Sequence, residues 1–499
     1  MNTDLQHNAC PDAYPADREQ APAGASRRAF LRRSGQLALS GTALPFALNL
    51  AAMGEAAAFE ATDYKALVCV FLYGGNDYAD TVVTYDDPSY NAYAAIRGGT
   101  GQAGGGLALA KAALTPTLLT PTTPLPDGRQ YALNPAMAGL AGLFNSGKAA
   151  VQLNVGPLVV PLTRAQYAGV DRKTYPLPPK LFSHNDQQSV WQSSGAEGAT
   201  VGWGGRIGDL AVSSNGTSTF TCISTTGNAV FLSGQTALPY QVSTNGAVPV
   251  SVVKNNVYGS TVVQNTLATL LQQNRSHVLE NEYNRVTARS VLTETKVSAA
   301  LGAGTTLTTT FPAGNSLADQ LSVVARLIGA RGSLGAKRQV FFVSIGGFDL
   351  HADLMTLHPV VLGKVSDAMT AFYNATVEMG VASQVTSFTA SDFGRTLASN
   401  GSGSDHGWGS HHFVVGGAVN GKAFYGSAPA VSIGNSATLA ADQGHVGQGR
   451  LLPGTSVDQY AATLARWFGV ADSELAGILP NLANFGQPAY PRNMGFMAG

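Results

Sequence analysis

The sequence predicts an α/β protein with a doubly wound, mostly parallel sheet and a β-rich insertion. Three apolar segments carry this prediction, at residues 65–73, 339–345 and 384–390. They lack polar alternation, which is typical of strands buried on both faces of a parallel sheet. Each segment ends in glycine or serine and then leads to an aspartate. Helical patterns lie between the strands, so the chain alternates strand, helix and strand.

The helices are predicted from apolar residues at helical spacing. Residues 317–330 precede the second of these strands, and residues 360–379 precede the third. Residues 134–144 predict an earlier helix rich in leucine and alanine, which a strand at 149–159 follows. Residues 457–468 predict an amphipathic helix near the end of the chain.

The globular part is expected to be one domain, over residues 59–499. Within it, residues from about 207 to 263 consist of short β-type runs separated by Ser, Thr, Gly and Asn turns. This composition predicts that the insertion is β-rich. Cys69 and Cys222 are isolated in the sequence, so two buried thiols are favoured over a disulfide.

The composition agrees with a large globular protein. Of its 499 residues, 44% are hydrophobic and 12% are charged, which is enough apolar material for a large core. The 30 Lys and Arg residues balance the 30 Asp and Glu residues. The chain therefore has no excess of positive charge, and its charge gives no indication of a nucleic acid or an anionic membrane as a partner.

Residues 1–58 are predicted to be a leader for export. Residues 26–32, Ser-Arg-Arg-Ala-Phe-Leu-Arg, match the twin-arginine motif. The apolar segment that follows, at 35–53, is too weakly hydrophobic for a membrane span, and the Ala triplet at 56–58 is a small-x-small cleavage signal. We expect the twin-arginine translocase as a partner during export and a mature periplasmic or extracellular chain without a stable membrane span. An uncleaved anchor is the alternative.

Asp77, Asp349 and Asp392 follow the three apolar strands. In an open parallel sheet, ligands bind beyond the carboxyl ends of the strands, where the loops converge. We therefore expect these three carboxylates to share one site. Each aspartate also suits a turn, because Gly-Gly-x-Asp is a turn sequence, so a purely structural role is the alternative.

Histidines are concentrated in two short loops beside these aspartates. Neighbouring aspartate and imidazole groups without a thiolate are typical of sites for zinc, manganese, iron or magnesium. The number of candidates is sufficient for two divalent ions, and a hydrogen-bonded structural loop is the alternative. The further candidate ligands are His351, Asp405, His406, His411 and His412.

Arg395 is the candidate catalytic residue. It lies three residues beyond Asp392, and a guanidinium group binds phosphate and sulfate oxygens well. A salt bridge within the loop is the alternative. The polar segment 183–188, which precedes Trp191, either lines the same cleft or forms a capped helix start with a packed Trp, and we favour the helix start.

Several ordered motifs give the sequence a family resemblance: VFLYGGND, FSHNDQQSVWQSS, SIGGFDLHADL, SDFGRTLASNGSGSDHGWGSHH and VDQYAATLARWFG. Together with the leader, they resemble the domain-of-unknown-function 1501 family of exported bacterial proteins, up to about Phe468. That family is similar to the alkaline phosphatase and sulfatase superfamily, whose doubly wound sheet carries two metals on Asp and His ligands. The resemblance implies that the ligands are Asp77, Asp349, His351, Asp405 and His406, with His411 or His412 completing a site.

The resulting functional expectation is an exported metal-dependent hydrolase of phosphate or sulfate esters, acting on an anionic small molecule or polymer. A non-catalytic exported assembly or binding factor with the same fold is the alternative. It is favoured by two departures from the superfamily: no Ser or Thr nucleophile can be assigned, and the Cys-x-Pro-x-Arg segment of the sulfatases has no counterpart.

Overall fold

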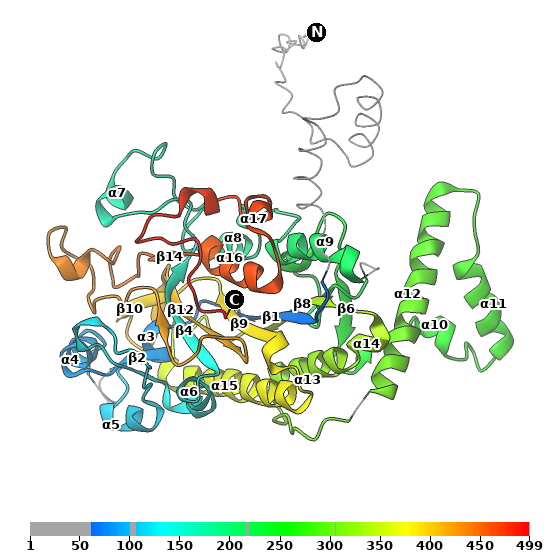
Figure 1. Ribbon diagram of the computed structural model, residues 1–499, viewed down its shortest axis with the longest axis horizontal. Helices are drawn as coiled ribbons and strands as arrows, with labels where there is room; N and C mark the ends of the chain where they lie inside the picture. Colours follow the sequence, from blue (N-terminus) through cyan, green and yellow to red (C-terminus); the bar gives the residue numbers. More distant parts are fainter. Residues whose placement is uncertain (1–60, 100–105, 216–218, 305, 499) are drawn as a thin grey trace, which may run out of the picture. The chain divides into compact units, whose positions relative to one another are not determined.

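A ten-stranded sheet forms the centre of the computed structural model (Figure 1). The structure describes residues 61–99, 106–215, 219–304 and 306–498, so the predicted leader lies outside the described residues. The strands of the sheet are β1 (Lys65–Leu72), β4 (Ala149–Gly156), β5 (Cys222–Ser224), β6 (Tyr240–Ser243), β7 (Gly246–Ala247), β8 (Arg338–Ile345), β9 (Val385–Ser391), β12 (Ser410–Gly416), β13 (Phe424–Tyr425) and β14 (Thr455–Ser456).

The sheet is mostly parallel, as the sequence predicts. Its order is β13-β4-β12-β9-β1-β8-β5-β6-β7, with β14 beside β4. Strands β8 and β9 flank β1, and both run parallel to it. Strand β12 is antiparallel to its neighbours β4 and β9, and β7 is antiparallel to β6. The three apolar strands predicted from the sequence are therefore adjacent in space.

Two small antiparallel pairs lie outside the sheet: β2 (Val82–Thr84) with β3 (Tyr131–Leu133), and β10 (Arg395–Ser399) with β11 (Ser404–His406).

Helices cover both faces of the sheet (Figure 1). One face packs on α6 (Ala138–Asn145), α13 (Ser316–Gly329) and α15 (Leu354–Glu378). The other packs on α8 (His184–Ser193), α9 (Trp203–Asn215), α16 (Val457–Phe468) and α17 (Asp472–Ile478). Consecutive residues of β1 alternate between these two apolar cores, with Val68 in the first and Cys69 in the second. This two-sided burial explains why the strand sequence has no polar alternation. The remaining helices are α3 (Tyr78–Thr81), α4 (Asp87–Ile96), α5 (Lys111–Leu114), α7 (Arg164–Ala168), α10 (Ser251–Lys254), α11 (Thr261–Gln272), α12 (Val278–Ala303) and α14 (Arg331–Leu334).

The predicted helices are present with small differences in their ends. Helix α16 begins at a capping box, in which Ser456 Oγ accepts from the Gln459 backbone N–H and the Gln459 side chain accepts from the Ser456 N–H. Helix α15 begins six residues earlier than residue 360 and continues through Pro359. Its additional first turns are fixed by packing, because Leu354 and His358 are buried there.

The segment 207–263 differs from the predicted β-rich insertion. Most of α9 occupies its beginning, and α10 and the start of α11 occupy its end. The short strands β5, β6 and β7 extend the central sheet and do not form a separate β unit. Several of the Ser, Thr and Asn residues that suggested a β-rich region lie within helices, such as Ser213, Ser214 and Asn215 in α9.

Cys69 and Cys222 are both free and buried, as expected. Among the described residues, no helix is both long enough and apolar enough to span a bilayer.

Candidate metal centre

The loops after β1, β8 and β9 bring the candidate residues together at one edge of the sheet. The loop after β1 passes so close to the loop after β8 that a Cβ atom on Gly74 would lie 2.3 Å from the backbone nitrogen of Asp349. Gly74 also has a φ of +116°, which side chains rarely adopt. Glycine is therefore required at this position by both conformation and space.

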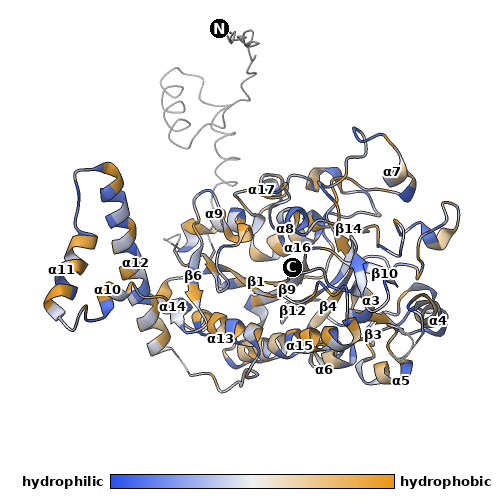
Figure 2. Cartoon of the chain, turned by 180° about the vertical axis from the view of Figure 1, so that it is seen from behind, coloured by the Kyte–Doolittle hydropathy of each residue, from blue (hydrophilic) through white to orange (hydrophobic). Residues whose placement is uncertain are grey.

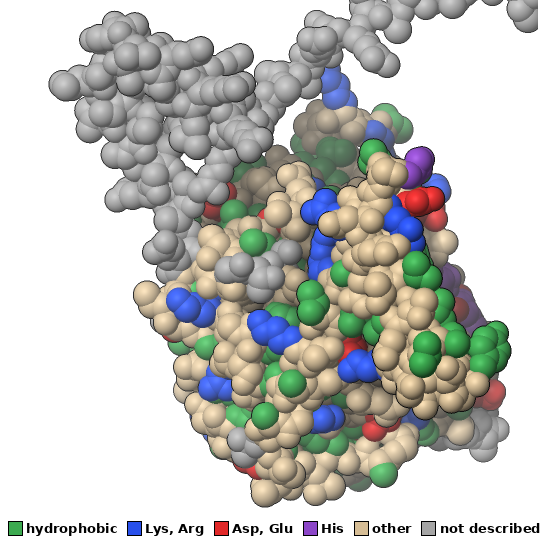
Figure 3. All heavy atoms as spheres, turned by 90° about the vertical axis from the view of Figure 1, so that its right-hand side faces the viewer, with side chains coloured by type: hydrophobic (Ala, Val, Ile, Leu, Met, Phe, Trp, Pro, Cys, Tyr) green, Lys and Arg blue, Asp and Glu red, His purple; other side chains and the backbone are tan. Residues whose placement is uncertain are grey.

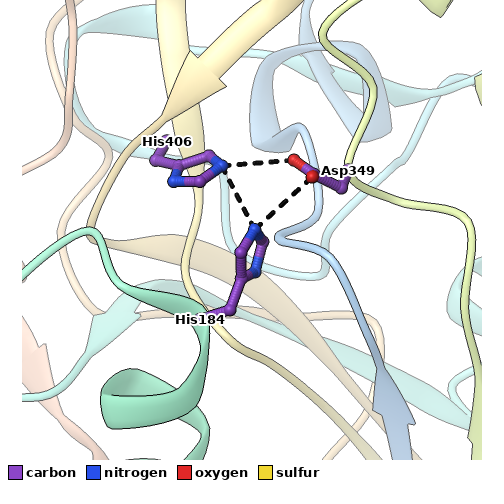
Figure 4. Close-up of side chains that lie close together, drawn as sticks. All are labelled: His184, Asp349 and His406. Atoms are coloured by element: carbon purple, nitrogen blue, oxygen red, sulfur yellow. Dashed lines mark hydrogen bonds and ion pairs between the residues drawn. The ribbon is translucent and has the colours of Figure 1, made fainter.

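Three side chains, those of His184, Asp349 and His406, have ligand atoms that all lie within 4.8 Å of one another (Figure 4), and His351 lies beside two of them. The Nε2 atom of His406 lies 3.1 Å from Nε2 of His184 and 3.0 Å from Nε2 of His351. Asp349 completes the group: its Oδ1 atom lies 3.2 Å from His406 Nε2 and 3.0 Å from His351 Nε2. Its Oδ2 atom lies 3.5 Å from His184 Nε2. We call these four residues the ligand cluster.

The other ring nitrogen of each histidine faces an oxygen. His184 Nδ1 lies 2.7 Å from Asp392 Oδ2, and His351 Nδ1 lies 3.1 Å from Asp405 Oδ1. His406 Nδ1 lies 2.8 Å from the backbone oxygen of Phe182, which can only accept a hydrogen bond. These oxygens orient the rings with Nδ1 as the donor and Nε2 turned to the centre. Asp392 and Asp405, which the sequence predicts as ligands, thus stand behind the histidines as their acceptors.

The arrangement of lone pairs fits a cation at the centre. A neutral imidazole that donates from Nδ1 carries only a lone pair on Nε2. Neighbouring atoms among these Nε2 lone pairs and the two Asp349 oxygens lie 3.0 to 3.5 Å apart, and they repel one another unless positive charge lies between them. A tetrahedral zinc site with bonds of about 2.0–2.1 Å would separate its ligand atoms by about 3.3 Å. Imidazole and carboxylate donors also suit manganese and iron.

Protonation of the cluster is strongly influenced by its surroundings. The hydrogen bond to Asp392 raises the pKa of His184 above its usual range, although burial opposes it. Burial lowers the pKa of His406. Burial tends to raise the pKa of Asp349, but the hydrogen bond and charge of Arg395 outweigh it and hold this pKa below its usual range. Asp349 therefore remains an ionised ligand.

Arg395 is completely buried and holds Asp349. Its Nη1 atom donates to Asp349 Oδ1 at 2.8 Å and to the backbone oxygen of Gly74 at 2.9 Å. Its Nε and Nη2 atoms donate to the backbone oxygen of Ser404. A guanidinium engaged and enclosed in this way does not reach a substrate. Arg395 does form a salt bridge, but it joins two loops, whereas the alternative suggested by the sequence was a salt bridge within its own loop. The enclosed position of Arg395 does not favour the predicted role in binding a phosphate or sulfate.

Asp77 lies in a buried network below the cluster. It forms an ion pair with Arg97, at 2.7 and 2.9 Å, and accepts backbone hydrogen bonds at the start of α3. Ser404 Oγ also donates to Asp77, at 2.6 Å. Burial tends to raise the pKa of Asp77, but Arg97 holds it below its usual range. Asp77 therefore supports the loop that carries Ser404, and its expected role as a metal ligand is not supported by its position.

His411 and His412, also predicted as ligands, belong to the core. Both are buried in β12. His411 Nδ1 accepts from the Asn154 backbone N–H at 3.0 Å, and His412 Nδ1 lies 3.3 Å from Thr389 Oγ1. The His412 ring packs against Trp191. Burial lowers the pKa of each histidine to about 3, so both rings are neutral. His411 and His412 are thus neighbours in a strand that is buried on both faces, and their adjacency does not indicate a metal site.

The described part of the chain assembles one cluster of this kind. The sequence allows for two ions because it counts Asp77, Asp392, Asp405, His411 and His412 as ligands. Since these side chains are engaged elsewhere or lie behind the histidines, the described residues provide the donors for one ion.

His184 is the ligand-cluster residue that the sequence analysis missed. It is the first residue of α8, and Gln188, one turn later, donates to the same Asp392 oxygen at 2.9 Å. The segment does begin a helix, although Ser183 makes no side-chain cap hydrogen bond. The other interpretation of the segment, that it lines the same cleft, agrees with the position of His184. The i, i+4 spacing of His184 and Gln188 was the available signal, because it places both on one helix face.

The cluster is partly open to solvent. The side chains of Asp349 and His351 are 45% and 46% exposed, and those of His184 and His406 are 28% and 26% exposed. The Phe393 ring packs beneath the two less exposed histidines, with centroid distances of 4.8 and 4.7 Å. The cluster is thus a candidate set of metal ligands that neighbouring side chains hold in place and that solvent can reach.

The family of this chain is clear from its sequence. The family model of proteins of unknown function, DUF1501, matches residues 64–474. The chain belongs to the DUF1501 family. The DUF1501 match spans all four residues of the ligand cluster. A search of curated proteins finds no match.

Among solved structures, this DUF1501 chain is similar to the crystal structure of Ps i-CgsB in complex with k-i-k-neocarrahexaose. The sequence identity is 9%, the match covers 85% of this chain and 77% of that chain, and the TM-score is 0.32. A likeness at this level is too low to carry an argument about fold or activity.

Proposed function

We propose that this chain is an exported hydrolase with a single divalent metal ion, held by His184, Asp349, His351 and His406. The observation that carries the proposal is the proximity of His184 Nε2, His406 Nε2 and the Asp349 carboxylate, with His351 Nε2 3.0 Å from both His406 Nε2 and Asp349 Oδ1. The Nδ1 atom of each histidine is held by an oxygen. Metal-binding histidines in proteins characteristically have such an acceptor behind them.

A bound divalent ion would polarise an ester oxygen and lower the pKa of water at the accessible side of the cluster. The chain's own residues prepare that side. Arg395 keeps Asp349 ionised, and Asp392 and Asp405 fix the rings of His184 and His351. The half-exposed His351 and Asp349 leave room for a substrate to approach.

Phosphate and sulfate esters are the proposed substrates. We base this on a proposed relationship to the alkaline phosphatases and sulfatases. It is supported by three adjacent parallel strands that each lead to an acidic residue at one edge of the sheet. The mostly parallel sheet and the Asp- and His-containing sequence motifs both support the proposed relationship to these enzymes.

We further propose that residues 1–58 direct the folded chain through the twin-arginine route to the periplasm or the cell exterior. The twin-arginine motif, the weakly apolar segment and the Ala triplet support this proposal. Export after folding would allow the metal to be bound in the cytoplasm.

A non-catalytic metal-binding factor is the second candidate. Two observations favour it: the Ser404 hydroxyl is buried and donates to Asp77, and Arg395 is enclosed. Neither group is available as a nucleophile or an anion-binding residue at the accessible side.

Metal analysis and ester hydrolysis together test the proposal. We expect the purified full chain to contain one equivalent of a divalent metal and to hydrolyse aryl phosphate or aryl sulfate. His351→Ala should lose both properties. His277→Ala, which changes an exposed histidine outside the cluster, should retain both. A metal-free wild-type chain after growth with zinc, manganese and iron would overturn the metal centre. Full metal content without turnover would favour the non-catalytic factor.

A further inference from the structure

A helical arm extends from the end of the sheet beyond β7. It consists of α10, α11 and α12, which are labelled at one side of Figure 1. The C-terminal half of α12 forms its base and packs on β7, α13 and α14, with Val297 and Ala300 buried. Lys254 of α10 forms an ion pair of 2.7 Å with Glu294 of α12. The arm is thus anchored at its base.

The outer part of the arm exposes an unusual number of large apolar side chains. Of the seventeen exposed large hydrophobic residues in the described chain, ten lie between residues 252 and 292. Single exposed apolar residues are ordinary, but a contiguous group marks an interaction site. Figure 2 shows orange stretches on α11 and α12, and Figure 3 shows hydrophobic side chains exposed on the side of the molecule that carries the arm. The ten residues are Val252, Tyr258, Val262, Val263, Leu270, Val278, Leu279, Tyr283, Val286 and Leu292.

Part of this group forms a regular stripe on α12. Leu279, Tyr283 and Val286 are spaced by four and three residues, which places them on one helix face. The same spacing leads through Ser290 and Thr293 to the buried Val297. The stripe is therefore covered by the body of the protein at the base of the arm and uncovered farther out, where Leu279, Tyr283 and Val286 are 75%, 64% and 48% exposed.

An apolar groove runs beside the stripe. Leu267, Leu270 and Leu271 of α11 and Leu279 and Tyr283 of α12 line it, and its volume is about 570 Å³. Arg275 and Glu280 lie at the same groove. A helix that covered the stripe would therefore also meet the side chains of α11.

The charges beside the stripe match those of a second α12 in the opposite direction. Glu282 and Arg289 are seven residues apart and lie on the same flank of the stripe. In an antiparallel pair of helices related by a two-fold axis near Tyr283 and Val286, Glu282 of each copy faces Arg289 of the other. Glu282 is half exposed and makes only a 3.5 Å contact with Arg285. In the described chain, Arg289 forms no ion pair, so both charges are available.

We propose that two copies of this chain associate through antiparallel α12 helices in a two-fold dimer. The stripe residues Leu279, Tyr283 and Val286 form its apolar core, and the reciprocal Glu282 and Arg289 pairs set its direction. The proposal does not depend on the metal centre, since none of the ligand-cluster residues belongs to the arm.

The oligomeric state of the full chain in solution tests the dimer. We expect sedimentation equilibrium to give a dimer at micromolar concentration. The double substitution Leu279→Glu and Tyr283→Glu should give a monomer with unchanged circular dichroism and metal content. Leu439→Glu, which changes another exposed leucine, should remain dimeric. A wild-type chain that is monomeric at every concentration tested would overturn the proposal, and so would a dimer that the double substitution leaves intact.

Charge reversal tests the antiparallel arrangement. Glu282→Arg alone and Arg289→Glu alone should each raise the dimer dissociation constant about tenfold, since each replaces two attractive pairs by two repulsive ones. The two substitutions combined should restore the wild-type value. Failure of the combined variant to recover would exclude this pairing. A monomeric wild type that sediments with anionic phospholipid vesicles would assign the stripe to a membrane surface and overturn the dimer.

Discussion

His184 Nδ1 lies 2.7 Å from Asp392 Oδ2, a contact between residues 208 positions apart in the chain. His184 begins α8, and Asp392 directly follows β9. Asp392 is fully buried, and the same oxygen also accepts from the Gln188 side chain at 2.9 Å and from the Gly74 backbone at 3.2 Å. This carboxylate therefore fixes the direction in which His184 Nε2 points.

Asp392→Asn tests that relationship. The amide oxygen of asparagine can still accept from His184, but it lacks the negative charge that makes the ring a strong ligand. We expect metal affinity to fall by about 10- to 100-fold, measured by competition with a chromogenic chelator. Asp367→Asn, at an exposed position of α15, is the control and should bind as the wild type does. Equal affinities in all three proteins would contradict a supporting role for Asp392.

Arg395→Met tests the support of Asp349. The substitution leaves Asp349 and the backbone oxygens of Gly74 and Ser404 without their buried donor. Because Asp349 is half-exposed, the loss comes mainly from the hydrogen bonds of the charged donor, which typically contribute about 1.5–3 kcal/mol each. We therefore expect a decrease of at least about 2 kcal/mol in the free energy of unfolding in urea, with loss of metal binding. Arg172→Met, at an exposed position, should unfold like the wild type. An Arg395→Met chain of wild-type stability would show that the enclosed guanidinium is dispensable.

Gly74→Ala tests the close approach of the two loops. A Cβ atom would lie 2.3 Å from the Asp349 nitrogen, and the φ of +116° is unfavourable for alanine. We expect the variant to lose at least about 2 kcal/mol of stability and to bind metal more weakly, because Asp349 must shift. Gly346→Ala provides a matched control in the loop after β8, since a Cβ there meets no atom within 4 Å. Similar melting temperatures for the two variants would contradict the argument.

The sheet could be predicted because the apolar composition of its strands indicates that they are buried on both faces. The residues of β1 are apolar on both faces and those of β8 mostly so, and burial between two helix layers follows from this composition. Strand β9 is equally buried, although four of its seven residues are Ser or Thr. The three aspartates after these strands were likewise predictable as neighbours, because parallel strands present their carboxyl ends at one edge. The prediction of a mostly parallel sheet, which the structure confirms, thus depends on the apolar composition of the individual strands.

The ligand cluster was only partly predictable, because ligation depends on side-chain direction. His184 and His406 are 222 residues apart, on α8 and β11, and only the folded arrangement of these elements brings their Nε2 atoms together. In the opposite sense, His411 and His412 lie within six residues of His406 but belong to a buried strand. Their Nδ1 atoms contact Asn154 and Thr389, partners that proximity in sequence does not reveal, and His412 Nε2 is buried without a hydrogen-bond partner among the described residues.

Asp458→Asn tests a pH dependence unrelated to the metal. Asp458 is buried in α16, and burial raises its pKa to about 6, although Asn481 and Ser194 donate hydrogen bonds to it. The folded chain therefore binds this proton more tightly than the unfolded chain, whose ordinary value is 3.8. Stability then decreases as pH rises through this window, by about 3 kcal/mol in total. The neutral asparagine variant should be more stable than the wild type at pH 8 and close to it at pH 4, as measured by urea unfolding. A constant difference between the two proteins across this range would contradict the assignment, and Asp319→Asn, at an exposed position, should follow the wild-type profile.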